Sequence, residues 1–356
     1  MQNLVNEVPA KKNYDFIDTI RGIAMISIVG EHCSAVGDYN FPVTAANYWT
    51  QLCLMQFNKF GTVTFFLLAG FLIGEKFADY TPSQYLKRRI STTFGPWLFW
   101  SLVYCLADII TIAVQARMYH DDRLNLANIL NEIKIVYLYT NYWFIVNFLI
   151  SISVLLIFRK HLYSLYLGAV LLAFYIFYAI NIYFEWIEPR HTSAVLGFVF
   201  FLWLGAQLRK HWHRVESWVT KTSYPILIFL LLLTFGACIY EVTLLTGHSV
   251  DAFNTLRVSN IFFSLVFFAL LLKIKTFKFV EYLKPRQTTY GIYLIHYILL
   301  VFLLPQILIH ITYDVYKFSI LEFILFKLAI FVFIYSITLG MVLLISNSRL
   351  KKLVGN

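Results

Sequence analysis

The chain has 356 residues, of which 60% are hydrophobic and 13% are charged, and its formal net charge is +10. Soluble globular domains have about 25% charged residues, so this composition excludes an ordinary soluble domain and predicts a protein surrounded largely by lipid. The basic residues stand in short runs between apolar segments, which is typical of the cytoplasmic loops of membrane proteins and does not indicate nucleic acid as a partner.

Membrane-spanning helices need about 20 mostly apolar residues. Ten segments meet or approach this requirement, and we predict an all-α, polytopic integral membrane protein that occupies residues 1–356 as a single domain without an appended soluble domain. In chain order the predicted spans are Phe16–Val36, Phe60–Glu75, Phe94–Val114, Tyr142–Phe158, Leu162–Tyr183, Ala194–Leu208, Tyr224–Leu245, Val258–Leu272, Thr289–Ile309 and Ile320–Ile345.

The distribution of basic residues predicts the orientation of these spans. If the N-terminus lies in the cytoplasm, most of the 29 Lys and Arg residues fall in cytoplasmic segments. The predicted outer segments contain only Arg117, Arg123, Lys134, Arg190, Arg257 and Lys317. This asymmetry favours both termini in the cytoplasm and an even number of spans. The longest outer segment contains NLANILNEIKIVYLY, which we expect to form a short helix at the outer surface.

The first predicted span carries four ionisable side chains that hydrocarbon would penalise. Arg21 and His32 are eleven positions apart, so they lie on one helix face at an axial separation of about 16 Å. Asp18 precedes Arg21 by three residues and is placed to pair with it. Glu31 points about 100° away from His32, and we expect it to contact another helix.

Two interpretations of Arg21 and His32 remain open on these grounds. Arg21 either reaches the cytoplasmic headgroups beside Asp18 or takes part in function, and His32 is either a hydrogen-bond donor between helices or a reactive group. A neutral imidazole in a poorly solvated site is a good general base, and a guanidinium binds phosphates. Together they suit acyl transfer from a phosphate-bearing carrier to a hydroxyl group.

Five motifs in chain order resemble the type-three membrane acyltransferases, a family that includes polysaccharide O-acetyltransferases. They are Arg21-Gly22 with His32 ten residues later, FFLLAGFLIG (Phe65–Gly74) with Ala69 in place of the usual serine, YLKRRISTTFGPWLFWSLVY (Tyr85–Tyr104), YWFIVNFLI (Tyr142–Ile150), and TYGIYLIHYILL (Thr289–Leu300) with Tyr297 in place of proline. The ten predicted spans agree with the core of this family.

The resemblance implies roles for several residues. His32 would be the catalytic base and Arg21 its essential partner. Arg88 and Arg89, with Lys87, would lie at a cytoplasmic mouth where acyl-CoA, most often acetyl-CoA, enters. The family's RxxR pair in this loop is not matched, because Ser91 lies three positions after Arg88. Both direct transfer and an acyl-histidine intermediate are compatible with these residues.

The resemblance also implies an acceptor: a hydroxyl group on an outward-facing cell-envelope glycan or lipid-linked sugar, reached from the plasma or inner membrane. The chain would complete the transfer itself or pass the acyl group to a separate envelope acyltransferase. Three further residues are candidates on the substrate side, namely Trp143, His296 and Glu31. Trp143 would stack on a sugar or lie in the aromatic belt at the membrane interface, and His296 would line the acceptor side or join two helices.

No metal is expected, because the four cysteines lack metal-ligand spacing. Two other function classes are compatible with intramembrane charges. One is a transporter or exporter of a lipid-linked or small polar solute, in which Arg21 binds the anion and His32 relays protons. The other is a sensor or assembly protein of the envelope, which would have no chemistry at His32.

Overall fold

The computed structural model describes residues 14, 16–37, 41–76, 81–311 and 313–356. Over these ranges the chain folds into sixteen α-helices and contains no β-strand. The helices are α1 (Phe16–Ala35), α2 (Ala46–Phe57), α3 (Gly61–Lys76), α4 (Pro82–Arg89), α5 (Gly95–Tyr119), α6 (Leu126–Tyr139), α7 (Trp143–Ile157), α8 (Leu165–Phe184), α9 (Val199–Lys210), α10 (Trp212–Lys221), α11 (Tyr224–Leu245), α12 (Val258–Ile274), α13 (Lys278–Tyr282), α14 (Pro285–Ile298), α15 (Leu304–Leu308) and α16 (Ile320–Ser346).

This architecture confirms an all-α polytopic membrane protein, and each of the ten predicted spans contains a helix. Among the described residues, six helices are long and apolar enough to cross a membrane, or seven if α6 and α7, which are bent by 55° relative to one another, count as one span. The remaining predicted spans fall on α1, α9 and α12. Helix α1 carries three charged residues, and α9 and α12 have 12 and 17 residues. The expected helix of the outer segment is α6, which packs on α5.

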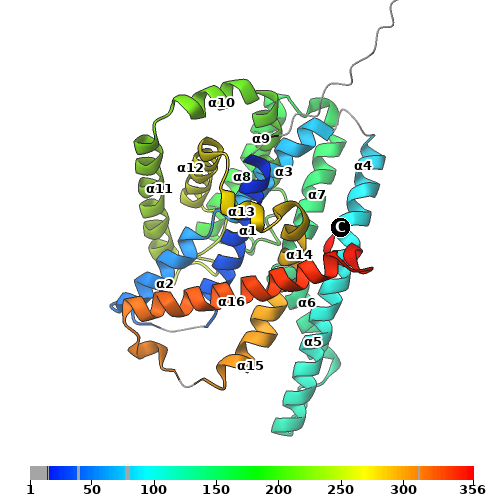
Figure 1. Ribbon diagram of the computed structural model, residues 1–356, viewed down its shortest axis with the longest axis vertical. Helices are drawn as coiled ribbons and strands as arrows, with labels where there is room; N and C mark the ends of the chain where they lie inside the picture. The colour runs from blue at the N-terminus through cyan, green and yellow to red at the C-terminus, as the bar shows by residue number, and fades with distance from the viewer. Residues whose placement is uncertain (1–13, 15, 38–40, 77–80, 312) are drawn as a thin grey trace, which may run out of the picture.

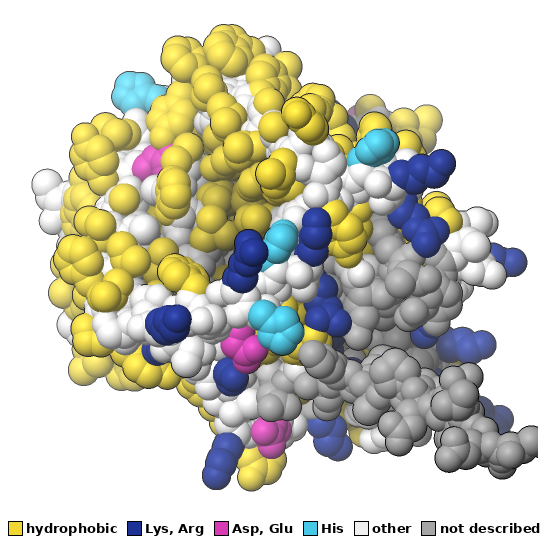
Figure 2. All heavy atoms as spheres, turned by 90° about the horizontal axis from the view of Figure 1, so that it is seen from above, with side chains coloured by type: hydrophobic (Ala, Val, Ile, Leu, Met, Phe, Trp, Pro, Cys, Tyr) yellow, Lys and Arg dark blue, Asp and Glu magenta, His cyan; other side chains and the backbone are white. Residues whose placement is uncertain are grey.

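Connections predicted to be cytoplasmic contact one another at one end of the bundle. Lys273 Nζ donates hydrogen bonds to the carbonyls of Val219 and Thr220 at the end of α10, and the Tyr163 hydroxyl donates to the Gly74 carbonyl at the end of α3. Figure 2 shows Lys and Arg side chains gathered over the face that lies at the top of Figure 1, where α10 runs.

Connections predicted to be outside meet at the other end. Asn47 bonds to the Phe318 carbonyl, Asn254 bonds to the Pro189 carbonyl, and the Arg190 guanidinium lies 4.3 Å from the centre of the Tyr139 ring. The two groups of connections therefore separate as the alternation of ten segments requires.

Helix α1 occupies the centre of the bundle. It packs against α2, α3, α12, α14 and α16, and in Figure 1 it lies between α5 and α11, which stand at opposite edges. By contrast, α11 directs large apolar side chains outward, among them Phe229, Leu232 and Leu233, which are 64%, 65% and 57% exposed. The charged side chains of α1 are consequently surrounded by protein, while helices such as α11 present the surface that lipid covers.

Helices α3 and α9 approach each other so closely that only glycine fits at two positions. A Cβ atom at Gly70 would lie 1.9 Å from the Leu202 carbonyl oxygen, and one at Gly205 would lie 2.1 Å from the Leu67 carbonyl oxygen. Small residues at helix crossings allow this close backbone contact in membranes, where the hydrophobic effect does not drive helices together. The Gly70 of the FFLLAGFLIG motif thus has a packing role.

Replacing Gly205 with alanine is expected to force α3 and α9 apart and to lower the free energy of unfolding by about 1–3 kcal/mol. The matched control is Gly236→Ala in α11, where a Cβ atom meets nothing within 4 Å. Thermal unfolding in detergent, followed by tryptophan fluorescence, measures both variants. Equal melting temperatures for the two would contradict the close-contact explanation.

Candidate active site

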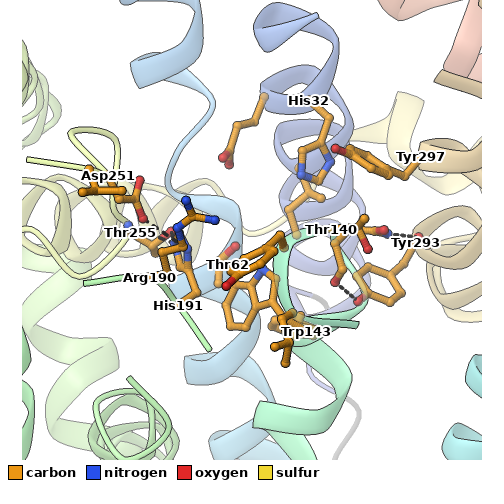
Figure 3. Close-up of a pocket in the computed structure, with 17 residues that line it drawn as sticks. His32, Thr62, Thr140, Trp143, Arg190, His191, Asp251, Thr255, Tyr293 and Tyr297 are labelled. Atoms are coloured by element: carbon orange, nitrogen blue, oxygen red, sulfur yellow. Dashed lines mark hydrogen bonds and ion pairs between the residues drawn. The ribbon is translucent and has the colours of Figure 1, made fainter. Parts of the chain in front are cut away.

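A cavity of about 340 Å³ lies between α1, the start of α7, and loops that are predicted to be outside, and we call it the outer cavity. It is lined by Glu31, His32, Trp143, His191, Asp251 and Tyr297, among others. Figure 3 shows His32 and Tyr297 on one side of this cavity, His191, Asp251 and Thr255 on the opposite side, and Trp143 between them. The cavity therefore combines acids, bases, hydroxyls and aromatic rings, a mixture that suits a polar, hydroxylated ligand.

A second cavity of about 240 Å³ lies nearer the basic end, which is predicted to be cytoplasmic, and we call it the inner cavity. Arg21 and Arg89 line it, together with Thr92, Thr93 and Tyr290. Thr92 and Thr93 belong to a short π-helical turn (Ile90–Phe94) between α4 and α5. Gly355 also lines this cavity, so the C-terminus lies at the same end of the bundle as the beginning of α1.

Three side chains line both cavities, and we call them the shared wall: Ile28, Phe144 and Tyr293. Tyr293 is held by a reciprocal pair of hydrogen bonds with Asn141, whose side-chain amide donates to the Tyr293 carbonyl over 2.9 Å while the Tyr293 hydroxyl donates to the Asn141 carbonyl. Arg21 and His32 thus face two cavities that meet at Ile28, between them on α1.

The charged residues of α1 have partners. Arg21 Nη1 lies 2.7 Å from Asp18 Oδ1, the i, i+3 pair expected from the sequence. Glu31 Oε1 lies 2.5 Å from Lys59 Nζ, where the chain passes from α2 to α3. The Lys59–Glu31 pair is buried, with side chains 8% and 15% exposed, whereas Asp18 is 55% exposed. Glu31 therefore contacts a neighbouring segment rather than His32.

The basic run on α4 divides into two groups. Arg89 lines the inner cavity, where its Nε donates to the Tyr85 hydroxyl over 3.1 Å. Lys87 and Arg88 are exposed and do not line either of the two cavities. Within this run the structure thus brings only Arg89 next to Arg21.

His32 is joined to His296, a residue 264 positions away. His32 Nδ1 lies 2.9 Å from His296 Nε2, and His296 Nδ1 lies 2.8 Å from the Ile292 carbonyl one turn earlier on α14. The side chain of His296 is fully buried, while His32 is partly exposed to the outer cavity. The Tyr297 ring packs edge-on against His32, with 5.1 Å between ring centres.

Opposite His32, the outer cavity contains residues that the sequence motifs did not indicate. His191 Nδ1 lies 3.5 Å from Asp251 Oδ2, and its Nε2 lies 2.9 Å from the Thr255 hydroxyl. Burial lowers the pKa of His191, although Asp251 opposes this shift. Trp143 stacks on His191 with 4.7 Å between ring centres, so it faces the cavity. His191 and Asp251 lie in two loops whose sequences have no helical periodicity. The polar residues around Arg190 were the only sequence feature that could have indicated this side of the cavity.

Metal ligands do not gather in the part of the chain that the structure describes: it contains no group of three or more His, Cys, Asp or Glu side chains placed to hold an ion.

Comparison with known families identifies one match over nearly the whole chain. A family model described as an acyltransferase domain matches residues 14–345. This range includes both cavities except for Gly355. Comparisons with curated proteins and with solved structures give no significant match.

Replacing Glu31 with glutamine is expected to leave the charge of Lys59 buried without its partner and to lower the free energy of unfolding by about 3–5 kcal/mol. The matched control is Asp18→Asn, which breaks the more exposed pair of the same helix and should cost at most about 1 kcal/mol. The double variant Glu31→Gln/Lys59→Met should recover much of the loss. Thermal unfolding measures all three, and a Glu31 variant as stable as the control would refute a stabilising pair.

Proposed function

The chain belongs to the type-three membrane acyltransferase family, whose domain it matches over residues 14–345, and from this premise we propose what it transfers and to what. The donor is cytoplasmic acyl-CoA, with acetyl as the acyl group. The acceptor is a hydroxyl group of a cell-envelope glycan or lipid-linked sugar, presented at the outer side of the cell membrane. Family membership makes the chain an acyltransferase, and the exporter and sensor hypotheses are set aside.

The observation that carries this proposal is the pair of cavities, one lined by two arginines and one lined by His32, that meet at the shared wall of Ile28, Phe144 and Tyr293. An enzyme that joins a cytoplasmic donor to an outer acceptor needs one binding site on each side and a short path for the acyl group between them. The inner cavity offers cations, and the outer cavity offers an imidazole among hydroxyl and aromatic side chains.

The inner cavity suits the donor. Arg21 and Arg89 present two guanidinium groups, which bind phosphate oxygens through paired, charge-assisted hydrogen bonds. The phosphates of coenzyme A would remain at this basic end, and its pantetheine arm would run along α1 so that the thioester reaches His32. The apolar residues Met25 and Phe148 line the intervening part of the cavity.

The outer cavity suits the acceptor and the chemistry. In the proposed reaction, His32 accepts the proton of the acceptor hydroxyl while its oxygen attacks the thioester carbonyl. The tetrahedral intermediate collapses with cleavage of the carbon–sulfur bond, and the imidazolium returns the proton to the thiolate of coenzyme A. Trp143, Asp251 and the hydroxyls of Thr62 and Thr255 would surround the acceptor sugar.

Donor binding is testable within the basic run. Arg89→Ala is expected to weaken acetyl-CoA binding on the order of tenfold or more, because a charge-assisted contact contributes about 1.5–3 kcal/mol. Arg88→Ala removes the same charge from the exposed neighbouring position and should leave binding nearly unchanged. Calorimetry on the protein in nanodiscs measures both, and equal weakening would show that only general positive charge matters.

The role of His32 is testable in inside-out membrane vesicles, whose cytoplasmic face is accessible to added donor. With radiolabelled acetyl-CoA, wild-type vesicles should incorporate label into their glycans or glycolipids, and His32→Ala should abolish incorporation while the protein remains folded. His310→Ala, which alters an exposed histidine near the outer end, is the control. Incorporation at the wild-type rate by the His32 variant would refute the proposed base.

A further inference from the structure

The hydrogen bonds of His296 determine which of its nitrogens carries a proton. Its Nδ1 lies 2.8 Å from the Ile292 carbonyl oxygen, which can only accept, so Nδ1 donates. His296 is fully buried, and no carboxylate of the described residues forms an ion pair with it. A neutral ring in this setting has a single N–H group, and its Nε2 is therefore an acceptor.

The same reasoning extends to His32. Its Nδ1 lies 2.9 Å from His296 Nε2, and because that atom accepts, Nδ1 of His32 carries the proton. A neutral His32 then has its lone pair on Nε2, and within the described residues no hydrogen bond occupies that atom. Since His32 lines the outer cavity and Nδ1 is committed to His296, Nε2 is the nitrogen available to a ligand there.

We propose that His296 is a positioning residue that fixes the tautomer and ring orientation of His32, so that Nε2 is the basic nitrogen toward the acceptor. This inference rests on the proposed function, in which His32 is the base. His296 itself neither gains nor loses a proton. When His32 accepts the hydroxyl proton at Nε2, its Nδ1–H bond to His296 becomes charge-assisted and stabilises the imidazolium until the proton passes to the thiolate.

His191 provides a contrast inside the same cavity. Its Nδ1 faces Asp251 Oδ2, and its Nε2 contacts the hydroxyl of Thr255 and receives the backbone N–H of Thr255 over 3.3 Å. Both ring nitrogens are engaged, so His191 has no lone pair free for a ligand. Of the two histidines that line the outer cavity, only His32 is held through one nitrogen with the other open.

A pair of substitutions separates positioning from mere space-filling. His296→Gln retains an acceptor, because its carboxamide oxygen can receive the Nδ1–H of His32, whereas His296→Leu fills similar space without one. We expect the glutamine variant to keep turnover within about tenfold of wild type and the leucine variant to lose on the order of 10²–10⁴-fold in kcat, the effect of a wrong tautomer in other catalytic histidines. Acetyl-CoA binding should be unchanged in both, and equal kcat values for the two variants would overturn the proposal.

A spectroscopic measurement tests the tautomer without activity. In ¹⁵N-histidine solid-state NMR of the protein in lipid, with the signals of His32 identified among the nine histidines by their loss in His32→Gln, wild-type His32 should show a protonated Nδ1 and an unprotonated Nε2. A protonated Nε2 in the wild-type protein would overturn the inference even if neither His296 variant folds. An active His32→Ala variant would instead refute the proposed function, which keeps the two failures distinct.

Discussion

Hydrocarbon cannot solvate charge, and this constraint organises the bundle around α1. The charged side chains and the histidine of this helix have partners supplied by the protein: Asp18 for Arg21, Lys59 for Glu31 and His296 for His32. The partners of Glu31 and His32 come from two other parts of the bundle. Polar contacts as well as packing therefore fix the rotation of α1 and its position along its own axis. These partners give the side chains of α1 the polar environment that lipid does not provide.

A second buried network holds the outer end in place. Arg257, whose side chain is fully buried, donates to the Asn254 and Cys238 carbonyls over 3.1 and 3.2 Å and to the Gln56 side chain. Gln56 in turn donates to Asn260 over 3.0 Å. This network connects α2, α11 and α12, close to the loops that carry His191 and Asp251. The wall opposite His32 is thereby attached to the helices, and the distance across the outer cavity does not depend on the loops alone.

Local spacing and charge asymmetry made part of this structure predictable. The Asp18–Arg21 pair follows from a separation of three residues, and the alternation of connections follows from the basic runs. The hydrogen bond between His32 and His296 spans 264 positions, and no periodicity links the two motifs. His191 and Asp251 lie in irregular loops. Glu31 pairs with Lys59 because the turn between α2 and α3 places this lysine beside α1. These contacts depend on how helices pack, which a single sequence does not specify.

The shared wall has a consequence for the membrane as a barrier. The cavity at the basic end and the cavity at the outer end have three lining residues in common, Ile28, Phe144 and Tyr293, so one aliphatic and two aromatic side chains stand between them. Apolar constrictions of this kind exclude ions because water does not fill them. In the proposed reaction, only the thioester end of the pantetheine arm passes this layer while the phosphates of coenzyme A stay at the basic end, so the cell would modify its exterior without exporting a cofactor and without opening a conduit for protons.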